Sequence, residues 1–340
     1  MDWRDTIVAW LAGQTSWAYH GDAPLASEPA ALTALALGAH GQSAKPALDW
    51  LVDRQTADGS IGITLEQSTP GWPTAQVMLA WALADRQAAS GAGRYATPIA
   101  RATDWLLAAR GITLERTAQL GHDSTLVGWP WVTGTHSWIE PTAWAVLALK
   151  AIGLAQHART REAVRLLVDR LLPEGGCNFG NTFVLGQILL PHMQSSGVCL
   201  LALAGENIDD PRIGRTCDYL EREISRRTAT ASLSYSLLGL AAHDRQPAMA
   251  GEKIDDPRID QTSQYLERQI SRRTATASLS YSLLGLAAHD RQFVDAGPLL
   301  AAAAERMLVQ DRSAHKLSLL ALAAKADDHP LTTLVMERLP

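Results

Sequence analysis

Two glutamates each precede a proline where the sequence predicts the start of an apolar helix. These pairs are Glu28-Pro29 and Glu140-Pro141, and Ala/Leu runs follow both. Proline suits the first helical turn, where its missing N–H costs no hydrogen bond, and a carboxylate there interacts favourably with the helix dipole. Beside tryptophan in a dry cavity, such a carboxylate has a raised pKa and can act as a general acid. We therefore name Glu140 and Glu28 as catalytic candidates, with helix capping as the alternative role.

A histidine lies four residues before the second of these glutamates. His136 belongs to a segment that Gly128, Pro130 and Gly134 keep out of regular secondary structure. An imidazole at this spacing can orient the Glu140 carboxylate or pass a proton to it, because its pKa lies near neutral pH. The alternative is an ordinary structural histidine of a loop. We include His136 among the catalytic candidates.

Tryptophans gather in the same region of the chain. All 11 lie within the first 144 residues, and Gly-Trp-Pro occurs twice, at 71–73 and 128–130. Faces of aromatic rings stabilise a carbocation by several tenths to about 2 kcal/mol each in a desolvated site. The same rings could instead fill the centre of the fold and leave no cavity. With polar groups for positioning, the substrate-binding candidates are Trp17, Trp72, Trp129, Trp131, Trp138, Asn178, Phe179, Asn181, Tyr235 and Tyr281.

Composition excludes several classes of function. The 340 residues are 47% hydrophobic and 19% charged, which is typical of a globular protein with a large core. A net charge of −5 offers no basic surface for nucleic acid. The polar N-terminus does not resemble a secretory signal, and no apolar run reaches the ~18 residues of a transmembrane segment. Peripheral membrane contact stays open.

The three cysteines do not form an even disulfide framework, and reduced thiols in the cytoplasm are the simpler interpretation. Cys177, His192 and Cys199 fall close together in the sequence, but their spacing matches no known set of metal ligands. We therefore expect a cytoplasmic protein with no metal and no cofactor. The sequence leaves its oligomeric state open.

A tandem duplication occupies the second half of the chain. Residues 205–246 recur as residues 251–292, and the two copies differ at only six positions. Each copy contains an Asp-Asp-Pro start signal, an amphipathic helix, two arginines and a second, more apolar helix. We interpret residues 1–340 as a single domain with a duplicated hairpin at 205–250 and 251–296.

Weaker copies of the same hairpin fill the rest of the chain. Ala/Leu runs that are apolar nearly all round predict an inner helical layer, and the amphipathic helices before them predict an outer layer. No segment has the alternation typical of a strand. Neither end is more polar than the middle, so we predict an all-α fold, a closed α/α toroid of six to seven helical hairpins, rather than an open solenoid. The outer helices are predicted at 3–13, 47–55, 98–110, 161–172, 211–226, 257–272 and 298–308, and the inner helices at 28–38, 73–85, 140–153, 194–204, 228–242, 274–288 and 314–324.

Three segments carry a family resemblance. The Gln-Thr-Ala-Asp-Gly-Ser-Ile-Gly stretch at 55–62 resembles the Gln…Asp-Gly-Gly-Trp-Gly repeat of squalene/hopene cyclases and prenyltransferase β-subunits. Residues 174–181 resemble a second, altered copy, and residues 138–144 resemble the start of an inner helix in bacterial proteins with these repeats. The resemblance implies an α/α toroid whose central cavity holds an isoprenoid.

The chain also departs from that family. Ile61 and Cys177 replace the tryptophan of the repeat. The Asp-x-Asp-Asp acid motif of class II cyclases is missing, because its nearest match at 207–210 begins with asparagine and precedes a proline, which favours a helix cap. No Asp, Cys and His set matches the prenyltransferase zinc ligands. The seven predicted hairpins exceed the family's six by one, and removal of the duplicate restores six.

Three classes of function remain compatible with the sequence. The resemblance implies a squalene cyclase- or prenyltransferase-like protein that binds an isoprenoid or another apolar small molecule and cyclises or transfers it. The alternative is a non-catalytic toroid that serves as a scaffold or binds a partner protein. A lesser alternative is a carbohydrate-active α/α-barrel enzyme, because paired carboxylates and tryptophan platforms suit sugars as well.

Overall fold

Five of the seven predicted inner helices lie in the described part of the chain and begin where their sequence signals lie, whereas those predicted at 228–242 and 274–288 fall outside it. The computed structural model describes residues 3–19, 23–88, 93–117, 119–184, 186–223 and 313–323, with the single residues 243 and 308. Most of the duplicated region, with Tyr235 and Tyr281, lies outside them. Prolines stand in the first turns of α2, α4 and α6, as expected. The inner helices are α2 (Ser27–Ala39), α4 (Pro73–Gln87), α6 (Ile139–Ala151), α8 (Met193–Leu203) and α14 (Ala314–Ala323).

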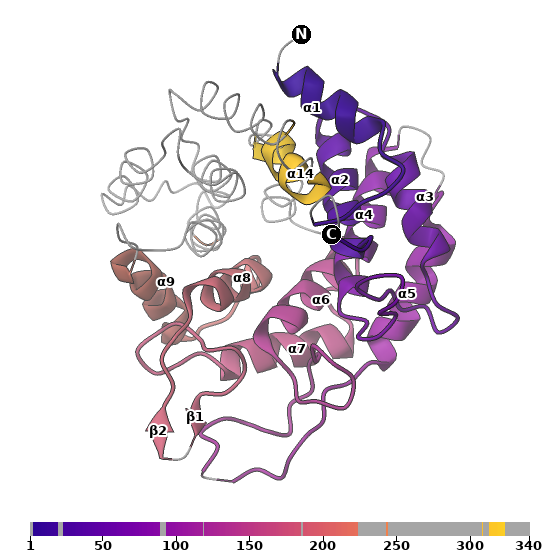
Figure 1. Ribbon diagram of the computed structural model, residues 1–340. Coiled ribbons are helices and arrows are strands. Elements are labelled where there is room, and N and C mark those ends of the chain that lie inside the picture. The colour runs from indigo at the N-terminus through magenta and orange to yellow at the C-terminus, as the bar shows by residue number, and fades with distance from the viewer. Residues whose placement is uncertain are drawn as a thin grey trace.

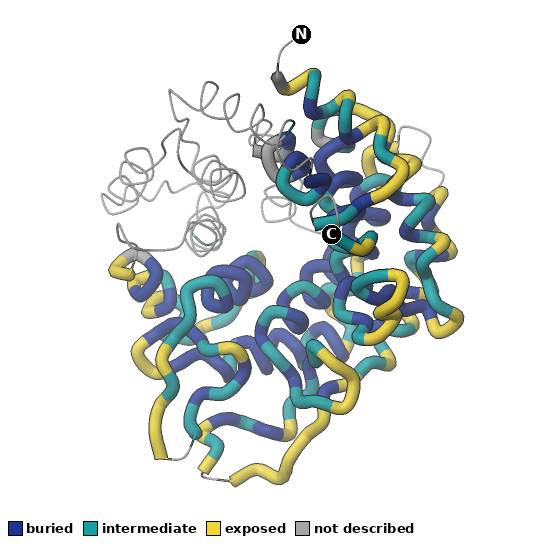
Figure 2. The backbone as a smooth tube through the Cα atoms, viewed as in Figure 1, coloured by how far each residue is buried: buried dark blue, intermediate teal, exposed yellow. Residues whose placement is uncertain are grey.

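The outer helices differ from the inner ones in how much of their surface is buried. Every residue of α6 except Glu140 and Trp144 is buried, whereas α5 buries only one stripe. Figure 2 shows this contrast between the two layers. An Ala/Leu helix with no polar face can be stable only between other helices. The outer helices are α1 (Trp3–Ala12), α3 (Lys45–Asp53), α5 (Ala96–Ala108), α7 (Ala158–Asp169) and α9 (Pro211–Glu223).

The inner helices pack side by side along an arc in the order α14, α2, α4, α6 and α8 (Figure 1). The contact between α14 and α2 joins the two ends of the chain. Thr33 Oγ1 and Ser318 Oγ share a hydrogen bond of 2.9 Å, and His40 Nε2 lies 2.7 Å from the Ala321 carbonyl oxygen. Between α9 and α14, the only described residues are 243, 308 and 313.

The helical hairpins of the described chain run from an inner helix to the outer helix that follows it. The close pairs are α2 with α3, α4 with α5, α6 with α7 and α8 with α9. The predicted pairing, from an outer helix to the next inner helix, was wrong. Loop length explains the observed pairing. The short connections at 40–44 and 152–157 keep an inner helix beside the outer helix that follows it, whereas the connection from α5 to α6 is the long loop 109–138.

One short strand pair interrupts the helices, where none was expected. β1 (Phe183–Val184) and β2 (Gln187–Ile188) form an antiparallel ladder in the long loop before α8. Gly186 in the turn has φ +82°, which glycine adopts without strain. Two-residue strands are too short for the alternating pattern to reveal. No described helix has the length and apolar character needed to cross a membrane.

The turns within 55–62 and 174–181, the two segments that resemble the family repeat, have the same structural role. Gly59 and Gly175 both have φ +92°, and a Cβ at either position would lie 2.2 or 2.1 Å from a backbone carbonyl oxygen of the next outer helix. In both cases an arginine of that outer helix also bonds the turn. Arg101 donates to the Thr56 carbonyl at 2.6 Å, and Arg215 donates to the Pro173 carbonyl at 2.7 Å. The repeat is therefore a docking turn between successive outer helices.

We expect Gly175→Ala to lower the free energy of unfolding by roughly 2–4 kcal/mol, because it adds a backbone clash to the strain of a positive φ. Urea denaturation followed by circular dichroism measures the change. Gly134→Ala is the matched control, since Gly134 has φ +83° but no atom within 4 Å of the added Cβ, and it should cost only about 1 kcal/mol. Equal losses in the two variants would argue against the docking role of this turn.

Candidate functional site

The long loops of the described chain all lead from an outer helix into an inner one. Because the inner helices alternate with antiparallel outer helices, their N-terminal ends face the same side of the molecule. A hydroxyl in the first turns of α4, α6 and α8 attaches the preceding loop. Thr74, Thr142 and Ser196 accept hydrogen bonds of 2.8–3.0 Å from the loop N–H groups of Ile61, Trp129 and Cys177. These hydrogen bonds keep the loops at the N-terminal ends of the inner helices.

Glu140 lies at this end, as the second residue of α6, and is half-buried. The buried hydroxyl of Ser195, on α8, donates to its Oε1 at 3.0 Å. Burial raises the pKa of the Glu140 carboxyl, and the Ser195 hydrogen bond and the nearby His192 oppose this only in part. Glu140 therefore keeps its proton to a higher pH than an ordinary glutamate does.

The histidine beside Glu140 is His192, not His136. His192 directly precedes α8, its ring lies 4.5 Å from the ring of Phe179, and no described residue bonds its buried Nδ1. His136 stacks on Trp138 at 4.4 Å and forms no hydrogen bond with Glu140. Burial and then the charge of Arg170 lower the pKa of His136. From the sequence, His192 was weighed only as a metal ligand, although its position at the start of an inner helix was a signal for the site.

Several predicted aromatic residues meet in pairs at this end of the inner layer. Trp72 and Trp131 come from different loops and contact edge to face, with ring centroids 5.1 Å apart. Both are half-buried, as is Trp138, and Phe179 is 42% exposed. The Phe179 carbonyl also accepts the N–H of Ile139 at 2.8 Å, directly beside Glu140. The loops that carry Trp138 and Phe179 therefore meet at the start of α6, next to Glu140.

Two other predicted rings are packed into the core. Trp129 is 2% exposed, donates from its indole N–H to the Leu106 carbonyl at 2.9 Å, and has the Arg159 guanidinium 4.4 Å from its ring. Trp17 is 1% exposed and packs edge-on against Trp50. These contacts support the fold directly, so we leave both rings out of the proposed wall.

The two asparagines differ in what they hold. Asn178 donates to the Leu190 carbonyl at 2.6 Å and accepts the N–H of Phe179 at 2.8 Å, which braces the loop before α8. Asn181 is half-buried and makes no side-chain hydrogen bond with another described residue. Only Asn181 therefore has a side chain available for a ligand.

Glu28 occupies the equivalent position on α2, again as the second helical residue. The Tyr19 hydroxyl donates to its Oε2 at 2.5 Å, and the Gln76 amide of α4 donates to its Oε1 at 3.5 Å. His315, the second residue of α14, lies with its ring 5.3 Å from that of Tyr19. The sequence did not reveal Gln76 or His315, because only the packing of three separate inner helices brings them to Glu28.

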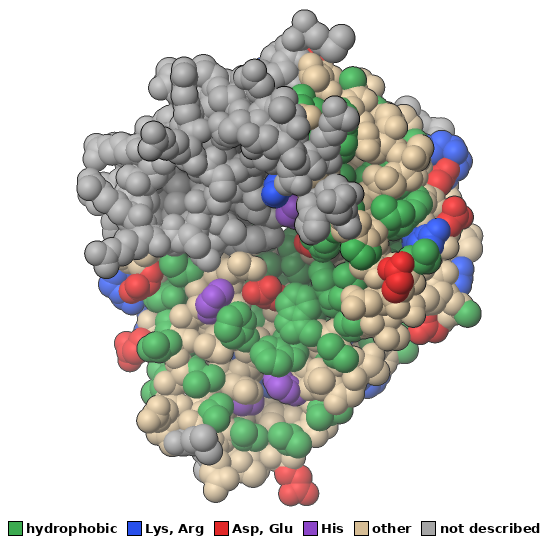
Figure 3. All heavy atoms as spheres, in the orientation of Figure 1, with side chains coloured by type: hydrophobic (Ala, Val, Ile, Leu, Met, Phe, Trp, Pro, Cys, Tyr) green, Lys and Arg blue, Asp and Glu red, His purple; other side chains and the backbone are tan. Residues whose placement is uncertain are grey.

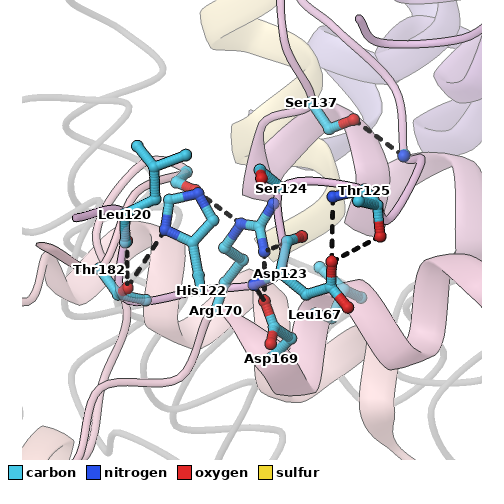
Figure 4. Close-up of polar contacts among 12 residues, drawn as sticks. Leu120, His122, Asp123, Ser124, Thr125, Ser137, Leu167, Asp169, Arg170 and Thr182 are labelled. Carbon is cyan, nitrogen blue, oxygen red and sulfur yellow. Dashed lines mark hydrogen bonds and ion pairs between the residues drawn. The ribbon is translucent and has the colours of Figure 1, made fainter. Parts of the chain in front are cut away.

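A buried arginine fixes the two longest loops above the site (Figure 4). Arg170 donates to the Gly180 carbonyl at 2.8 Å in one loop and to the Asp123 carbonyl at 3.2 Å in the other, and it pairs with Asp169. His122 lies beside this guanidinium, and burial lowers its pKa. The loops that carry Trp131, Trp138 and Phe179 thus have a common anchor.

The face drawn in Figure 3 is hollowed near its middle, and acidic and histidine side chains lie there among hydrophobic ones. No group of three His, Cys, Asp or Glu side chains in the described chain could hold a metal. Cys177 and Cys199 are buried, and their mutual hydrogen bond, with burial, raises the pKa of Cys199. Asp210 accepts the N–H of Arg212 at 2.9 Å, so it caps the outer helix α9 as expected.

Comparison with known proteins identifies this architecture. No family model matches the sequence, and no curated protein matches it. Among solved structures, the chain is similar to a variant of the type II terpene cyclase MstE from Scytonema in complex with geranylgeranyl dihydroxybenzoate, with a TM-score of 0.50, 14% identity, and coverage of 88% of this chain and 99% of that one. The fold is terpenoid cyclase-like.

A second structure of the same cyclase, in complex with merosterolic acid A, aligns with a TM-score of 0.49 and 14% identity over 91% of this chain and 99% of that one. At this level of identity the likeness concerns the fold alone.

Proposed function

We propose that the chain binds an isoprenoid in the hollow at the inner-helix ends and that Glu140 starts its cyclisation by protonating a double bond. The observation that carries this proposal is the environment of Glu140. Burial raises its pKa, the Ser195 hydroxyl donates a hydrogen bond to it, and the loops that carry Trp138 and Phe179 meet at the start of its helix. A carboxylic acid that keeps its proton to a higher pH than an ordinary glutamate is the kind of group that proton-initiated cyclisation requires.

The proposed step moves one proton and the electrons of one double bond. The Glu140 carboxyl gives its proton to an alkene carbon, the π electrons form the new C–H bond, and the neighbouring carbon becomes a cation. The next double bond attacks this cation and closes a ring. An adjacent carbon then loses a proton to water, which gives an isomer of the substrate, and a proton from water restores the Glu140 carboxyl. Ring faces of Trp72, Trp131, Trp138 and Phe179 would stabilise the cations by up to about 2 kcal/mol each.

We also propose that the inner layer closes into a toroid within a single domain. The contacts of α14 with α2 and α1 support this, because they bring the last described helix beside the first two helices of the chain. The duplicated segments at 205–250 and 251–296 lie between α8 and α14 in the sequence, and we propose that they complete the ring. A closed ring gives the ligand a chamber with a lining on every side.

Incubation of the protein with geranylgeraniol and with geranylgeranyl dihydroxybenzoate in D₂O tests the proposal. We expect a cyclic isomer that carries one carbon-bound deuterium, which mass spectrometry detects, because the transferred proton comes from an exchangeable acid. Binding without any cyclic product would leave an isoprenoid-binding protein and contradict the acid role. Absence of both binding and product would favour the non-catalytic scaffold.

A further inference from the structure

The second polar group at the inner-helix ends differs in chemistry from the one around Glu140. It consists of Tyr19, Glu28, Gln76 and His315, from the loop before α2 and from helices α2, α4 and α14. We name it the Glu28 cluster. All four side chains are half-buried.

Hydrogen bonding leaves one atom of this cluster unsatisfied. The Gln76 Nε2 group donates to Glu28, which fixes the orientation of the amide because the reverse orientation would place its oxygen against a carboxylate. No described residue bonds the Gln76 Oε1 atom, although that atom is buried. A buried acceptor without a donor costs free energy, so the position suits a ligand that donates a hydrogen bond.

The charges around this acceptor favour a neutral donor over an anion. The Glu28 carboxyl accepts a hydrogen bond from the same amide, and a carboxylate there repels an added negative charge. Burial lowers the pKa of His315, an effect that Glu28 opposes and Lys316 reinforces, so His315 is a weak source of positive charge at neutral pH. An alcohol or phenol O–H meets both requirements, whereas a diphosphate does not.

The cluster also lies at a suitable distance from Glu140. Helix α4 separates α2 from α6 in the inner layer. Packed helices lie about 8–10 Å apart, so the two polar groups are separated by roughly 16–20 Å along the arc. An extended chain of several isoprene units can reach from one to the other.

We propose that the Glu28 cluster receives a neutral hydroxylated head group at the end of the isoprenoid opposite the double bond that Glu140 protonates. This inference rests on the proposed function and narrows its substrate class to isoprenoid alcohols and phenols. Tyr19 and Gln76 are then specificity-determining residues. They recognise the head group and take no part in proton transfer to the chain.

Equilibrium dialysis with three probes of the same chain length tests the inference: geranylgeraniol, its methyl ether and geranylgeranyl diphosphate. We expect the wild-type protein to bind the alcohol roughly 10-fold or more tightly than the ether, since only the alcohol satisfies the buried acceptor. The diphosphate should bind more weakly than the alcohol. Gln76→Met and Tyr19→Phe should each remove most of the preference for the alcohol over the ether.

Matched controls separate this effect from general disturbance of the fold. Gln87→Met changes an exposed glutamine of the same helix, and Tyr95→Phe removes a hydroxyl that bonds Asp49 in the outer layer. Both should keep the wild-type preference, and circular dichroism checks the folding of all four variants. Equal binding of alcohol and ether, or tighter binding of the diphosphate, would overturn the head-group inference and leave the isoprenoid proposal intact. Failure to bind any probe would overturn both.

Discussion

Glu140→Gln is expected to reduce isoprenoid cyclisation by roughly 100-fold or more, because an amide cannot act as the general acid. Binding of the isoprenoid should change by no more than about 3-fold, since glutamine keeps the size of the side chain and the hydrogen bond to Ser195. Turnover measured by product formation, together with dialysis of the bound probe, separates the two quantities. Glu66→Gln, at an exposed loop position, is the control and should leave both unchanged.

The pH dependence provides an independent check of the same carboxyl. Its pKa is raised in the folded protein, so cyclisation should fall as the pH rises through that value. A carboxyl whose pKa is higher in the folded state than in the unfolded state also destabilises the fold progressively over the same range. The free energy of unfolding of Glu140→Gln, relative to the wild type, should therefore increase with pH. A constant difference would contradict the raised pKa.

Arg170→Ala is expected to lower the free energy of unfolding by roughly 3–5 kcal/mol, the range for removal of one partner from a buried ion pair. The guanidinium is 5% exposed and joins Asp169 to the carbonyl oxygens of Gly180 and Asp123. Its loss leaves both loops without their common anchor and those carbonyls without a donor. Denaturation in urea measures the change in stability.

The matched control is Arg165→Ala, an exposed residue of α7, the helix that Arg170 directly follows. It should shift the free energy of unfolding by about 0.5 kcal/mol or less. Arg170→Ala should also alter the near-ultraviolet circular dichroism, because Trp131 and Trp138 lie on one of the loops it holds. Similar losses of stability in the two variants would show that Arg170 is not the anchor.

Much of the fold follows from local signals in the sequence. Ala/Leu runs with a proline in the first turn predicted α2, α4 and α6 within about two residues, because a helix without a polar face has to be buried and proline restricts where it can begin. The same reasoning placed Glu28 and Glu140 at equivalent helix starts. Pairing of the hairpins was predicted wrongly, since helix patterns do not reveal which neighbour a long loop returns to.

The site shows where the sequence stops being informative. The sequence by itself predicted that carboxylates and tryptophans lie at the starts of apolar helices, because capping, periodicity and proline act over a few residues. Only the tertiary structure decided that His192, and not His136, lies beside Glu140, and that Gln76 and His315 meet Glu28. Those contacts join residues that are far apart in the chain, and they depend on the order and rotation of the inner helices, which packing of the whole layer sets.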